Sequence, residues 1–363
     1  MTRTIRVELP TRGYDVKIGA GLLRSVGAEA AALRNVRRVV AVSDSTVAGL
    51  YGSKALESLS SAALRADLLS FPSGESNKTL AGVGKLFDGL FRLEPAVDRD
   101  CVIVALGGGV VGDMAGFLAA TALRGLRWLQ VPTTLLADVD ASVGGKTAVD
   151  HAAGKNLIGA FHQPHGVLID VETLRTLPPG ELQSGLAECV KHAMIRDVSL
   201  LEFMENAADA ILACEPRPMT ELIARNVAIK AAVVAADERE HGQRAHLNFG
   251  HTVGHAIEAC EGYGRVTHGQ AVALGMIAAC RLAEGKALLG ASLRDRLEKL
   301  LARLGIEVRR RGLDGDAIWR IMQHDKKARG GKVRFVLPTG PGRVEVFDDV
   351  TEQQVKAAIA SLE

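Results

Sequence analysis

The sequence has few of the features that mark specialised protein classes. Only 4% of its 363 residues are aromatic, and 44 basic against 42 acidic side chains leave a formal charge of +2. A nucleic-acid partner or an anionic membrane surface calls for a basic excess, and base stacking calls for aromatic rings, so neither partner is expected. No apolar run is long enough to cross a bilayer, and the N-terminus MTRTIRVELP has no apolar signal segment. We therefore expect a soluble, cytoplasmic protein.

Cysteine is also scarce. The five cysteines are scattered, odd in number and free of CxxC spacing: Cys101, Cys189, Cys214, Cys260 and Cys280. This pattern predicts reduced thiols in the core of a cytosolic protein, with no disulfide framework. A length of 363 residues with 47% hydrophobic content is enough for two domains, each with its own core.

Strand-like and helix-like stretches alternate in the first half of the chain. The patterns predict strands at 3–9, 14–18, 38–42, 101–106 and 126–131, the first two as a hairpin, and helices at 55–66 and 79–90. Strands and helices in this order are typical of an α/β layer with a parallel sheet.

The pattern changes at Pro178-Pro179-Gly180, which is a natural boundary. Residues 181 to about 304 have a helical period and no convincing strand, and a hairpin at 332–337 and 343–347 precedes a last helix. The predicted domains are 1–177, an α/β domain with a parallel sheet, and 178–363, a mainly α-helical domain.

A glycine-rich turn follows the strand predicted at 101–106. Gly107, Gly109 and Gly112 form GxGxxG between a strand and a helix, where the backbone can approach a pyrophosphate near free N–H groups. A tight turn that simply needs glycine is the alternative. The next strand ends in Thr133-Thr134 without the acidic residue that holds a ribose in a standard Rossmann unit. Asp44 is the better ribose candidate, and the sheet order can differ from the standard one.

The loop at 71–78, FPSGESNK, forms turns and opens a helix. Glu75 and Lys78 can hold the ribose or pyrophosphate of a dinucleotide from this loop. The alternative is a solvated loop with a capped helix.

Lysines also stand in glycine-rich turns between residues 140 and 156. Gly144-Gly145-Lys146-Thr147 resembles a phosphate loop, but Asp140 replaces the first glycine of GxxxxGK[ST], which argues against a nucleotide triphosphatase. Lys146 and Lys155-Asn156 suit a phosphorylated substrate or the nicotinamide side of a cofactor. Surface lysines are the alternative for any single position.

Histidines gather in the helical half. His251 and His255 are four residues apart in HLNFGHTVGHAIE and share a helix face, and His268 follows in VTHGQAVALGM. No glutamate follows His251 directly, so this is not the HExxH motif of zinc proteases.

Glu188 can complete a site of two histidines and one carboxylate, with open positions for water or a substrate oxygen. The alternative is a surface ion pair with Lys191, three residues later on the same helix. His192 is a rival ligand. Because a catalytic zinc needs fewer ligands than these, we expect at least one histidine to act as an acid, a base or an anion-binding group.

Cations recur around these motifs. Arg244 and Asn248 lie one turn apart shortly before His251, so they can face the same cleft. A cleft lined by five cations would suit a dianionic substrate: Lys146, Lys155, Lys191, Lys230 and Arg244.

Together these motifs resemble the 3-dehydroquinate synthase family of the shikimate pathway. The resemblance covers most of the chain, in the order SGESNK, LGGGVVGD, QVPTTLLADVDASVGGKTAVD, GKNLIGAFHQP, LPPGELQSGLAECVKH, LNFGHTVGHAIE, THGQAVALGM and HDKK. It implies an NAD-binding α/β domain and a helical domain with the active site between them, usually in a homodimer. The implied enzyme is a carbon–oxygen lyase that converts 3-deoxy-D-arabino-heptulosonate 7-phosphate into 3-dehydroquinate and phosphate, using NAD catalytically and a divalent metal, Zn²⁺ or Co²⁺.

The resemblance also implies roles for individual residues. Glu188, His251 and His268 would bind the metal, leaving His255 as a donor near the substrate phosphate and His192 as a structural residue. NAD would contact Asp44, Ser73, Gly74, Glu75, Lys78, Gly109, Val110, Gly112, Asp113, Thr133, Thr134, Lys146, Lys155, Thr173, Leu174 and Thr176. The substrate would be surrounded by Asp140, Lys146, Lys155, Asn156, Lys191, Lys230, Arg244, Asn248 and Lys326.

Arg124 resembles the family arginine that reaches the phosphate site of a neighbouring subunit. Two departures from the family pattern are Ala122-Leu123 in place of an aromatic and Ala137-Asp138 in place of Ala-Gln. Neither departure falls at a residue to which the resemblance assigns a ligand contact.

Three alternative functions stay open. The first is another sugar phosphate cyclase, against which Arg244 and Asn248, placed to hold a carboxylate, favour the shikimate substrate. The second is a metal-dependent polyol dehydrogenase, which would turn over NAD(H) stoichiometrically. The third, a catalytically dead NAD-binding module, would lack ligands or cations, and none is missing.

Overall fold

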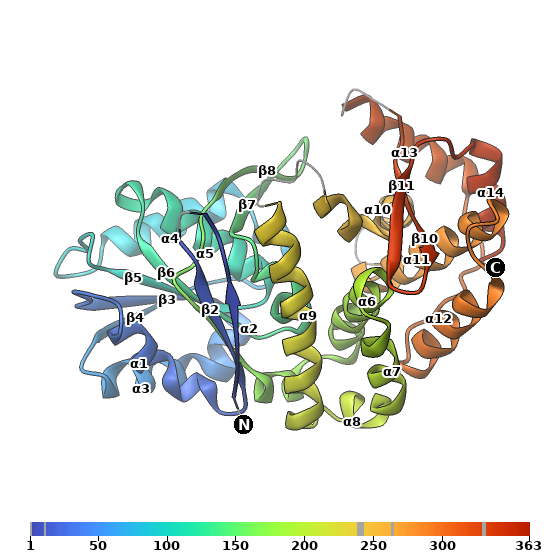
Figure 1. Cartoon of the computed structure of the whole chain (residues 1–363). Coiled ribbons are helices and arrows are strands. Elements are labelled where there is room, and N and C mark those ends of the chain that lie inside the picture. The colour runs from blue at the N-terminus through green and yellow to red at the C-terminus, as the bar shows by residue number, and fades with distance from the viewer. Residues whose placement is uncertain (1, 11, 238–242, 263–264, 329–331) are drawn as a thin grey trace. The chain divides into compact units, whose positions relative to one another are not determined.

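The computed structural model describes residues 2–10, 12–237, 243–262, 265–328 and 332–363, with the backbone alone for 243–244 and 325–328. The chain divides into two compact units (Figure 1). The first unit comprises Met1–Leu177 and Pro216–Ala235, and the second comprises Pro178–Glu215 and Ala236–Glu363.

The first unit is built on a seven-stranded sheet in the order β1-β2-β9-β6-β5-β3-β4. Its strands are β1 (Arg3–Val7), β2 (Tyr14–Gly19), β3 (Arg38–Asp44), β4 (Arg65–Phe71), β5 (Val102–Gly107), β6 (Arg127–Pro132) and β9 (Val167–Asp170). All neighbours are parallel except β1 and β2, which form the predicted hairpin. The prediction of an α/β layer with a parallel sheet is therefore confirmed.

Helices pack on both faces of this sheet because successive buried residues of its inner strands point to opposite sides. Val40 and Val42 of β3 join a core with α4 and α5, whereas Val39 and Ala41 join a core with α1 and α3. The helical segments of the first unit are η1 (Leu22–Ser25), α1 (Val26–Ala31), α2 (Ser45–Val47), η2 (Ala48–Gly52), α3 (Ser53–Ser61), η3 (Glu75–Asn77), α4 (Leu80–Phe91), α5 (Gly109–Thr121), η4 (Ala122–Arg124), η5 (Ala137–Ala141), η6 (Val171–Thr176) and α9 (Pro216–Ala236).

The strand order reverses at β3. Numbered along the chain from β3, the strands β4-β3-β5-β6-β9 have the order 2-1-3-4-5. This order differs from the standard Rossmann order, a possibility that the missing acidic residue after β6 had indicated. In such sheets the ligand crevice opens where the order reverses, at the carboxyl ends of the strands. Asp44 ends β3 and Gly107 ends β5, so both lie at this crevice.

Several elements differ from the sequence patterns. The helix predicted at 55–66 ends at Ser61, because Ala63 takes a left-handed backbone (φ 58°) and the edge strand β4 begins at Arg65. The short strand β9 and the hairpin of β7 (Lys146–His151) and β8 (Gly154–Phe161) have no predicted counterpart. The strands at 38–42, 101–106 and 126–131 and the helix at 79–90 are confirmed within two residues.

The second unit is mainly helical. Its elements are α6 (Pro179–Arg196), α7 (Val198–Asn206), α8 (Ala208–Leu212), η7 (Gln243–Asn248), α10 (His251–Glu261), α11 (His268–Gly285), α12 (Ala291–Arg303), α13 (Gly315–Ala328), β10 (Phe335–Gly340), β11 (Arg343–Phe347) and α14 (Glu352–Ala360). The pair β10 and β11 is the predicted C-terminal hairpin, followed by the predicted last helix.

Two further predictions concern membrane-spanning helices and cysteines. None of the described helices is both long and apolar enough to cross a membrane. None of the five cysteines forms a disulfide, as predicted, and all except the partly exposed Cys260 are buried.

Asp138, where the family pattern has glutamine, is a fully buried carboxyl group in η5. Neither carboxyl oxygen has a hydrogen-bond partner among the described residues. Burial, aided by the nearby charge of Asp170, raises the pKa of Asp138 well above its ordinary value. An unfolded chain ionises this group above a pH of about 4, while the folded chain resists ionisation. Asp138 therefore lowers the stability of the fold increasingly as the pH rises.

We predict that Asp138→Asn raises the free energy of unfolding at pH 8 by about 1–3 kcal/mol, because asparagine keeps the side-chain size but cannot ionise in the unfolded chain. Urea unfolding at pH 5 and pH 8 measures this, and the gain should be smaller at pH 5. Asp88→Asn on the exposed face of α4 is the control, with an expected change within about 0.5 kcal/mol. An equal effect of Asp138→Asn at both pH values would contradict the prediction.

Candidate metal centre and dinucleotide site

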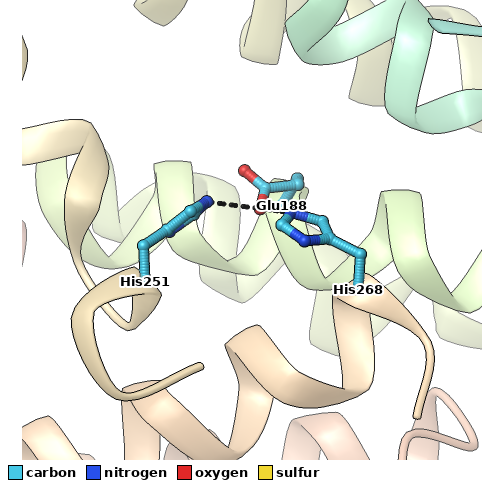
Figure 2. A group of neighbouring side chains, drawn as sticks. All are labelled: Glu188, His251 and His268. Carbon is cyan, nitrogen blue, oxygen red and sulfur yellow. Dashed lines mark ion pairs between the residues drawn. The ribbon is translucent and has the colours of Figure 1, made fainter. Parts of the chain in front are cut away.

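Three side chains from three helices of the second unit meet at one point. Figure 2 shows Glu188 of α6 between His251 of α10 and His268 of α11. Glu188 Oε1 lies 3.4 Å from His251 Nε2 and 3.7 Å from His268 Nε2. One ligand atom from each residue lies within 4.8 Å of the others.

Close helix packing brings the three residues together. A Cβ added at Gly269, next to His268, would stand 2.2 Å from Ser184 Cα, so α11 can approach α6 only through glycine. A Cβ at Gly254, three residues after His251, would stand 2.8 Å from the carbonyl oxygen of Ala271 in α11. Small residues at helix contacts thus fix the distances between the three ligand candidates.

His251 is the first residue of α10 and His268 the first residue of α11, and each ring has an oxygen atom beside its Nδ1. His251 follows Gly250, whose left-handed backbone (φ 79°) starts α10. Its Nδ1 lies 3.1 Å from the carbonyl oxygen of Phe249, and His268 Nδ1 lies 3.4 Å from Glu258 Oε2. An acceptor at Nδ1 favours the tautomer with the proton there, so that in the neutral rings Nε2 presents its lone pair toward Glu188.

The electrostatics of this group are dominated by burial and by Glu188. Burial alone raises the pKa of Glu188, but Lys191, His251 and His268 outweigh it and hold the pKa well below its ordinary range. Burial lowers the pKa of His251 to about 3 despite the attraction of Glu188, so this ring is neutral. For His268 burial lowers the pKa, yet the bonds to Glu188 and Glu258 raise it to about 9.

The residues fit a divalent metal. Ligand atoms about 2.1 Å from a tetrahedral Zn²⁺ lie roughly 3.4 Å apart, close to the distances from Glu188 Oε1 to the two Nε2 atoms. Glu188 has no exposed surface, so each of its oxygens needs a partner inside the protein. Its Oε2 pairs with Lys191 Nζ, which leaves Oε1 facing the two imidazoles. Two imidazoles and one carboxylate form the donor set of a catalytic zinc with an open position.

The two other histidine candidates take different places. His255 is exposed, and its ring centroid lies 5.1 Å from that of His251 and 5.8 Å from that of His268. His255 therefore borders the group and is the better placed of the two to meet a bound ligand. His192 is fully buried on α6, and a ring nitrogen of His192 lies within 4.8 Å of a carboxylate oxygen of Glu188, so it stays near the group from the same helix.

The glycine loop of the first unit leaves room for a ligand. Gly108 precedes α5 without a side-chain cap, so the first N–H groups of α5 are available to an anion. Among the described residues, a Cβ at Gly109 would come no nearer than 3.7 Å to another atom, and one at Gly112 no nearer than 3.9 Å. Because no neighbour in this part of the chain requires glycine at these two positions, they fit a cradle for a pyrophosphate.

The loops after β3 and β4 are tied together beside this crevice. Asp44 caps α2 by accepting hydrogen bonds from the N–H groups of Thr46 and Val47, at 2.9 and 3.0 Å. Thr46 Oγ1 donates to Ser73 Oγ at 3.2 Å, which joins the 44–46 turn to the 73–78 loop. The structure thus brings the predicted ribose residue Asp44 and the predicted Ser73-Gly74 segment together.

Lys78 is the centre of a second group of predicted residues. Its ammonium is buried, lies 2.6 Å from Asp113 Oδ2 and donates to Asn156 Oδ1 at 2.6 Å. Burial lowers its pKa, but Asp113 and Glu75 outweigh this and raise it. Lys155 Nζ lies 4.0 Å from Glu75 Oε1 at the exposed side of the same group. The loop at 73–78, α5 and the β7–β8 hairpin therefore share one polar cluster.

The remaining predicted NAD residues lie at neighbouring positions of the first unit. Thr133 and Thr134 follow β6, with the Thr133 N–H bonded to Gly107 O at 3.1 Å. Thr173 and Thr176 in η6 are joined to Tyr51, whose hydroxyl donates to Thr173 O at 3.1 Å and lies 2.6 Å from Thr176 Oγ1. Val110 and Leu174 lie in α5 and η6, and Lys146 is exposed at the start of β7.

The predicted substrate residues are spread over both units. Lys230 of α9 is ion-paired with Asp140 of η5 in the first unit. Asn248 is exposed in η7, and Arg124 is exposed in η4, where its backbone is left-handed (φ 68°). The side chains of Arg244 and Lys326 lie outside the described residues.

Two residues of the polar clusters carry no predicted role. Glu258 Oε2 lies 3.4 Å from His268 Nδ1, and Asp150 accepts a hydrogen bond from the Asn156 N–H at 2.8 Å. A signal existed for Glu258, because it lies seven residues after His251, two turns along the same helix. Its partner on another helix could not be read from that spacing.

Comparisons with known proteins agree along the whole chain. Residues 68–184 match the sequence family described as 3-dehydroquinate synthase N-terminal, and residues 185–328 match the family described as 3-dehydroquinate synthase C-terminal. The 3-dehydroquinate synthase of Desulforamulus reducens is 45% identical over 98% of this chain and 99% of its own length. That of Nostoc sp. PCC 7120 is 43% identical over 100% of both chains.

Solved structures show the same architecture. A 2-deoxy-scyllo-inosose synthase complexed with carbaglucose-6-phosphate, NAD⁺ and Co²⁺ has a TM-score of 0.89 and 29% identity, covering 99% of this chain and 100% of that chain. A 2-epi-5-epi-valiolone synthase from Streptomyces hygroscopicus, with NAD⁺ and Zn²⁺ bound, has a TM-score of 0.88 and 28% identity, covering 98% of both. A probable glycerol dehydrogenase from Sinorhizobium meliloti has a TM-score of 0.65 and 15% identity over 94% of both, which shows a shared fold only.

We predict that His251→Ala weakens Zn²⁺ binding by at least roughly 100-fold, because a ligand is lost, whereas His255→Ala retains it within about threefold. Competition with a chromophoric chelator measures both affinities. His255→Ala is the matched control, since it removes the same ring from the same helix. Equal losses of Zn²⁺ affinity in the two variants would contradict the division of roles between these histidines.

Proposed function

Because the chain belongs to the 3-dehydroquinate synthase family, we propose that it converts 3-deoxy-D-arabino-heptulosonate 7-phosphate into 3-dehydroquinate and phosphate. The single observation that carries this proposal is the full-length identity of 42–45% to 3-dehydroquinate synthases. The reaction uses NAD catalytically and a divalent metal, and it belongs to the shikimate pathway of aromatic amino acid biosynthesis.

Glu188, His251 and His268 are the proposed metal ligands. When bound, the metal supplies Lewis-acid polarisation of a substrate oxygen. The protein's own contribution is to hold the three donors on packed helices, with Lys191 paired to the outer oxygen of the carboxylate. His255, exposed beside this group, is proposed to donate a hydrogen bond to the substrate phosphate.

The crevice at β3 and β5 is the proposed NAD site. When bound, NAD accepts a hydride from the substrate alcohol and later returns it, so no cofactor is consumed. The N–H groups that begin α5 and the space at Gly109 and Gly112 support a pyrophosphate there. Asp44 and the 73–78 loop support the ribose contacts, and the buried Lys78 holds Asp113 and Asn156 in place.

Cations on each unit are proposed to hold the dianionic substrate. Lys146 and Lys155 of the β7–β8 hairpin and Lys230 of α9 serve on the first unit, and Lys191 on the second. Fixed cations near a phosphate stabilise the negative charge that develops as it departs. With the phosphate's own oxygen available as a base, these residues need not include a strong dedicated base.

Another sugar phosphate cyclase is the second candidate, because a 2-deoxy-scyllo-inosose synthase shares the fold at 29% identity. The 3-dehydroquinate synthases are closer, at 42–45% identity over nearly the whole chain. Arg244 and Asn248, the residues proposed for a substrate carboxylate, also favour the heptulosonate. The dehydrogenases share only the fold.

We also propose that the protein is a cytoplasmic homodimer. Leu157 and Phe161 on β8 expose 61% and 54% of their surface, and this hairpin packs on α5, whose end leads into Arg124. Exposed apolar side chains near an arginine suit a self-association surface. On this proposal, Arg124 reaches the phosphate site of the neighbouring subunit.

The reaction can be tested directly. We predict that the purified enzyme with Zn²⁺ or Co²⁺ and NAD releases one phosphate per heptulosonate phosphate without net accumulation of NADH. Phosphate release and absorbance at the NADH band are followed in the same assay, with His251→Ala as the inactive control. Stoichiometric NADH would instead support the dehydrogenase alternative.

The shared-site proposal is tested by complementation. We predict that Arg124→Ala lowers kcat by about 100-fold, and that mixing it with inactive His251→Ala restores about a quarter of wild-type activity. Half of randomly mixed dimers are hybrids, and each hybrid has one complete site if Arg124 acts across the interface. No recovery in hybrids verified by mass spectrometry would mean that Arg124 acts within its own subunit.

A further inference from the structure

His268 has an oxygen partner on each edge of its ring. Its Nε2 faces Glu188 Oε1 at 3.7 Å, on the proposed metal side, and its Nδ1 lies 3.4 Å from Glu258 Oε2. Glu258 lies in α10, two turns after His251, so a single helix carries one proposed ligand and the partner of another. The Glu258 side chain is 13% exposed and His268 is 31% exposed, so this contact is largely shielded from water.

The two proposed histidine ligands are oriented in different ways. His251 Nδ1 is matched by the main-chain carbonyl of Phe249, two residues before it, which is fixed by the backbone itself. His268 begins α11 after its cap residue Thr267, and the acceptor for its Nδ1 is the Glu258 side chain. The orientation of His268 therefore depends on a single replaceable residue.

We propose that Glu258 is a positioning residue of the metal site, which accepts the Nδ1–H of His268 and turns its Nε2 toward Glu188. This inference rests on the proposed function, in which His268 binds the metal. Glu258 acts through His268 and is not itself a ligand, because it lies on the ring edge opposite to Nε2. The group of ligand atoms within 4.8 Å of one another contains Glu188, His251 and His268 and leaves Glu258 out.

Two physical effects follow from a carboxylate at this place. It restricts the ring to the orientation and tautomer in which Nε2 holds the lone pair. It also makes the imidazole a stronger electron donor, since negative charge at Nδ1–H increases the basicity of Nε2. Loss of such outer partners typically weakens metal binding about 10–100-fold.

The test compares Zn²⁺ affinity of full-length variants by chelator competition, with no substrate present. Glu258→Ala is expected to weaken binding about 10–100-fold, and Glu258→Gln, which keeps an acceptor oxygen, is expected to fall between Glu258→Ala and wild type. Glu261→Ala is the matched control. Glu261 lies on the same helix and pairs with Arg310 at a contact apart from the histidines, so its loss should leave the affinity within about threefold of wild type.

A second readout separates positioning from a structural role. Zn²⁺ raises the thermal midpoint of a protein in proportion to its binding free energy, so the midpoint is measured with and without metal. Positioning predicts that Glu258→Ala reduces the rise caused by Zn²⁺, with a metal-free midpoint near that of wild type. The visible spectrum of the Co²⁺ form should also change, because it reports the ligand geometry.

The outcomes distinguish this inference from the proposed function. Wild-type Zn²⁺ affinity in His268→Ala would overturn the ligand assignment, and the Glu258 role with it. Loss of Zn²⁺ in His268→Ala but wild-type affinity in both Glu258 variants would overturn the Glu258 role alone. A metal-free midpoint that falls as far as the loaded one, in Glu258→Ala and in Glu258→Gln, would also overturn it.

Discussion

The burial of one carboxylate is the constraint on which the second unit depends. Glu188 has no exposed surface, and an isolated charge in such a place is costly unless cations or a metal compensate it. Lys191 compensates one oxygen, and two imidazole Nε2 atoms face the other. The helices must therefore lie close enough for these groups to meet. Glycines at the helix contacts allow this, since a Cβ at Gly269 would overlap the backbone of α6. The same close packing of helices therefore buries Glu188 and brings the three proposed metal ligands together.

The first unit meets a different requirement, that of holding an extended anion mainly through backbone groups. Its sheet order reverses at β3, so the carboxyl ends of β3 and β5 open a crevice, and α5 points its N-terminus there. Backbone N–H groups supply the positive potential, and no lysine needs to stand in the loop itself. The buried Lys78 instead links Asp113 and Asn156 from two other elements. This cluster holds the β7–β8 hairpin against α5, so it fixes the walls of the crevice.

Local pattern predicted β3, β5, β6 and α4, but it missed β9 and the β7–β8 hairpin and did not show how the elements combine. The GxGxxG turn lay between a strand and a helix as the glycines indicated, because that signal is contained in a dozen neighbouring residues. By contrast, helical spacing left His251, His255 and His192 as rival ligands, since spacing places residues on a face and says nothing of what that face meets. Resemblance separated them, and the structure places His251 of α10 and His268 of α11 beside Glu188. The contact of Glu258 could not be predicted for the same reason, because its partner His268 lies on another helix. The return of α9 to the first unit likewise depends on long-range contacts such as Lys230 with Asp140.

The fold alone does not decide the reaction, because dehydrogenases share this architecture at low identity. What distinguishes a cyclase must lie in side chains that hold an intermediate long enough for phosphate to leave and the hydride to return. A dehydrogenase releases its ketone, whereas a cyclase needs fixed cations to retain a dianion through several steps. Lys146, Lys155 and Lys230 on the first unit and Lys191 on the second are the proposed cations, and each is held on a strand or helix. Lys191 in addition pairs with Glu188, one of the proposed metal ligands. On this proposal the buried Glu188 ties the placement of a substrate cation to that of the metal, which a fold comparison cannot detect.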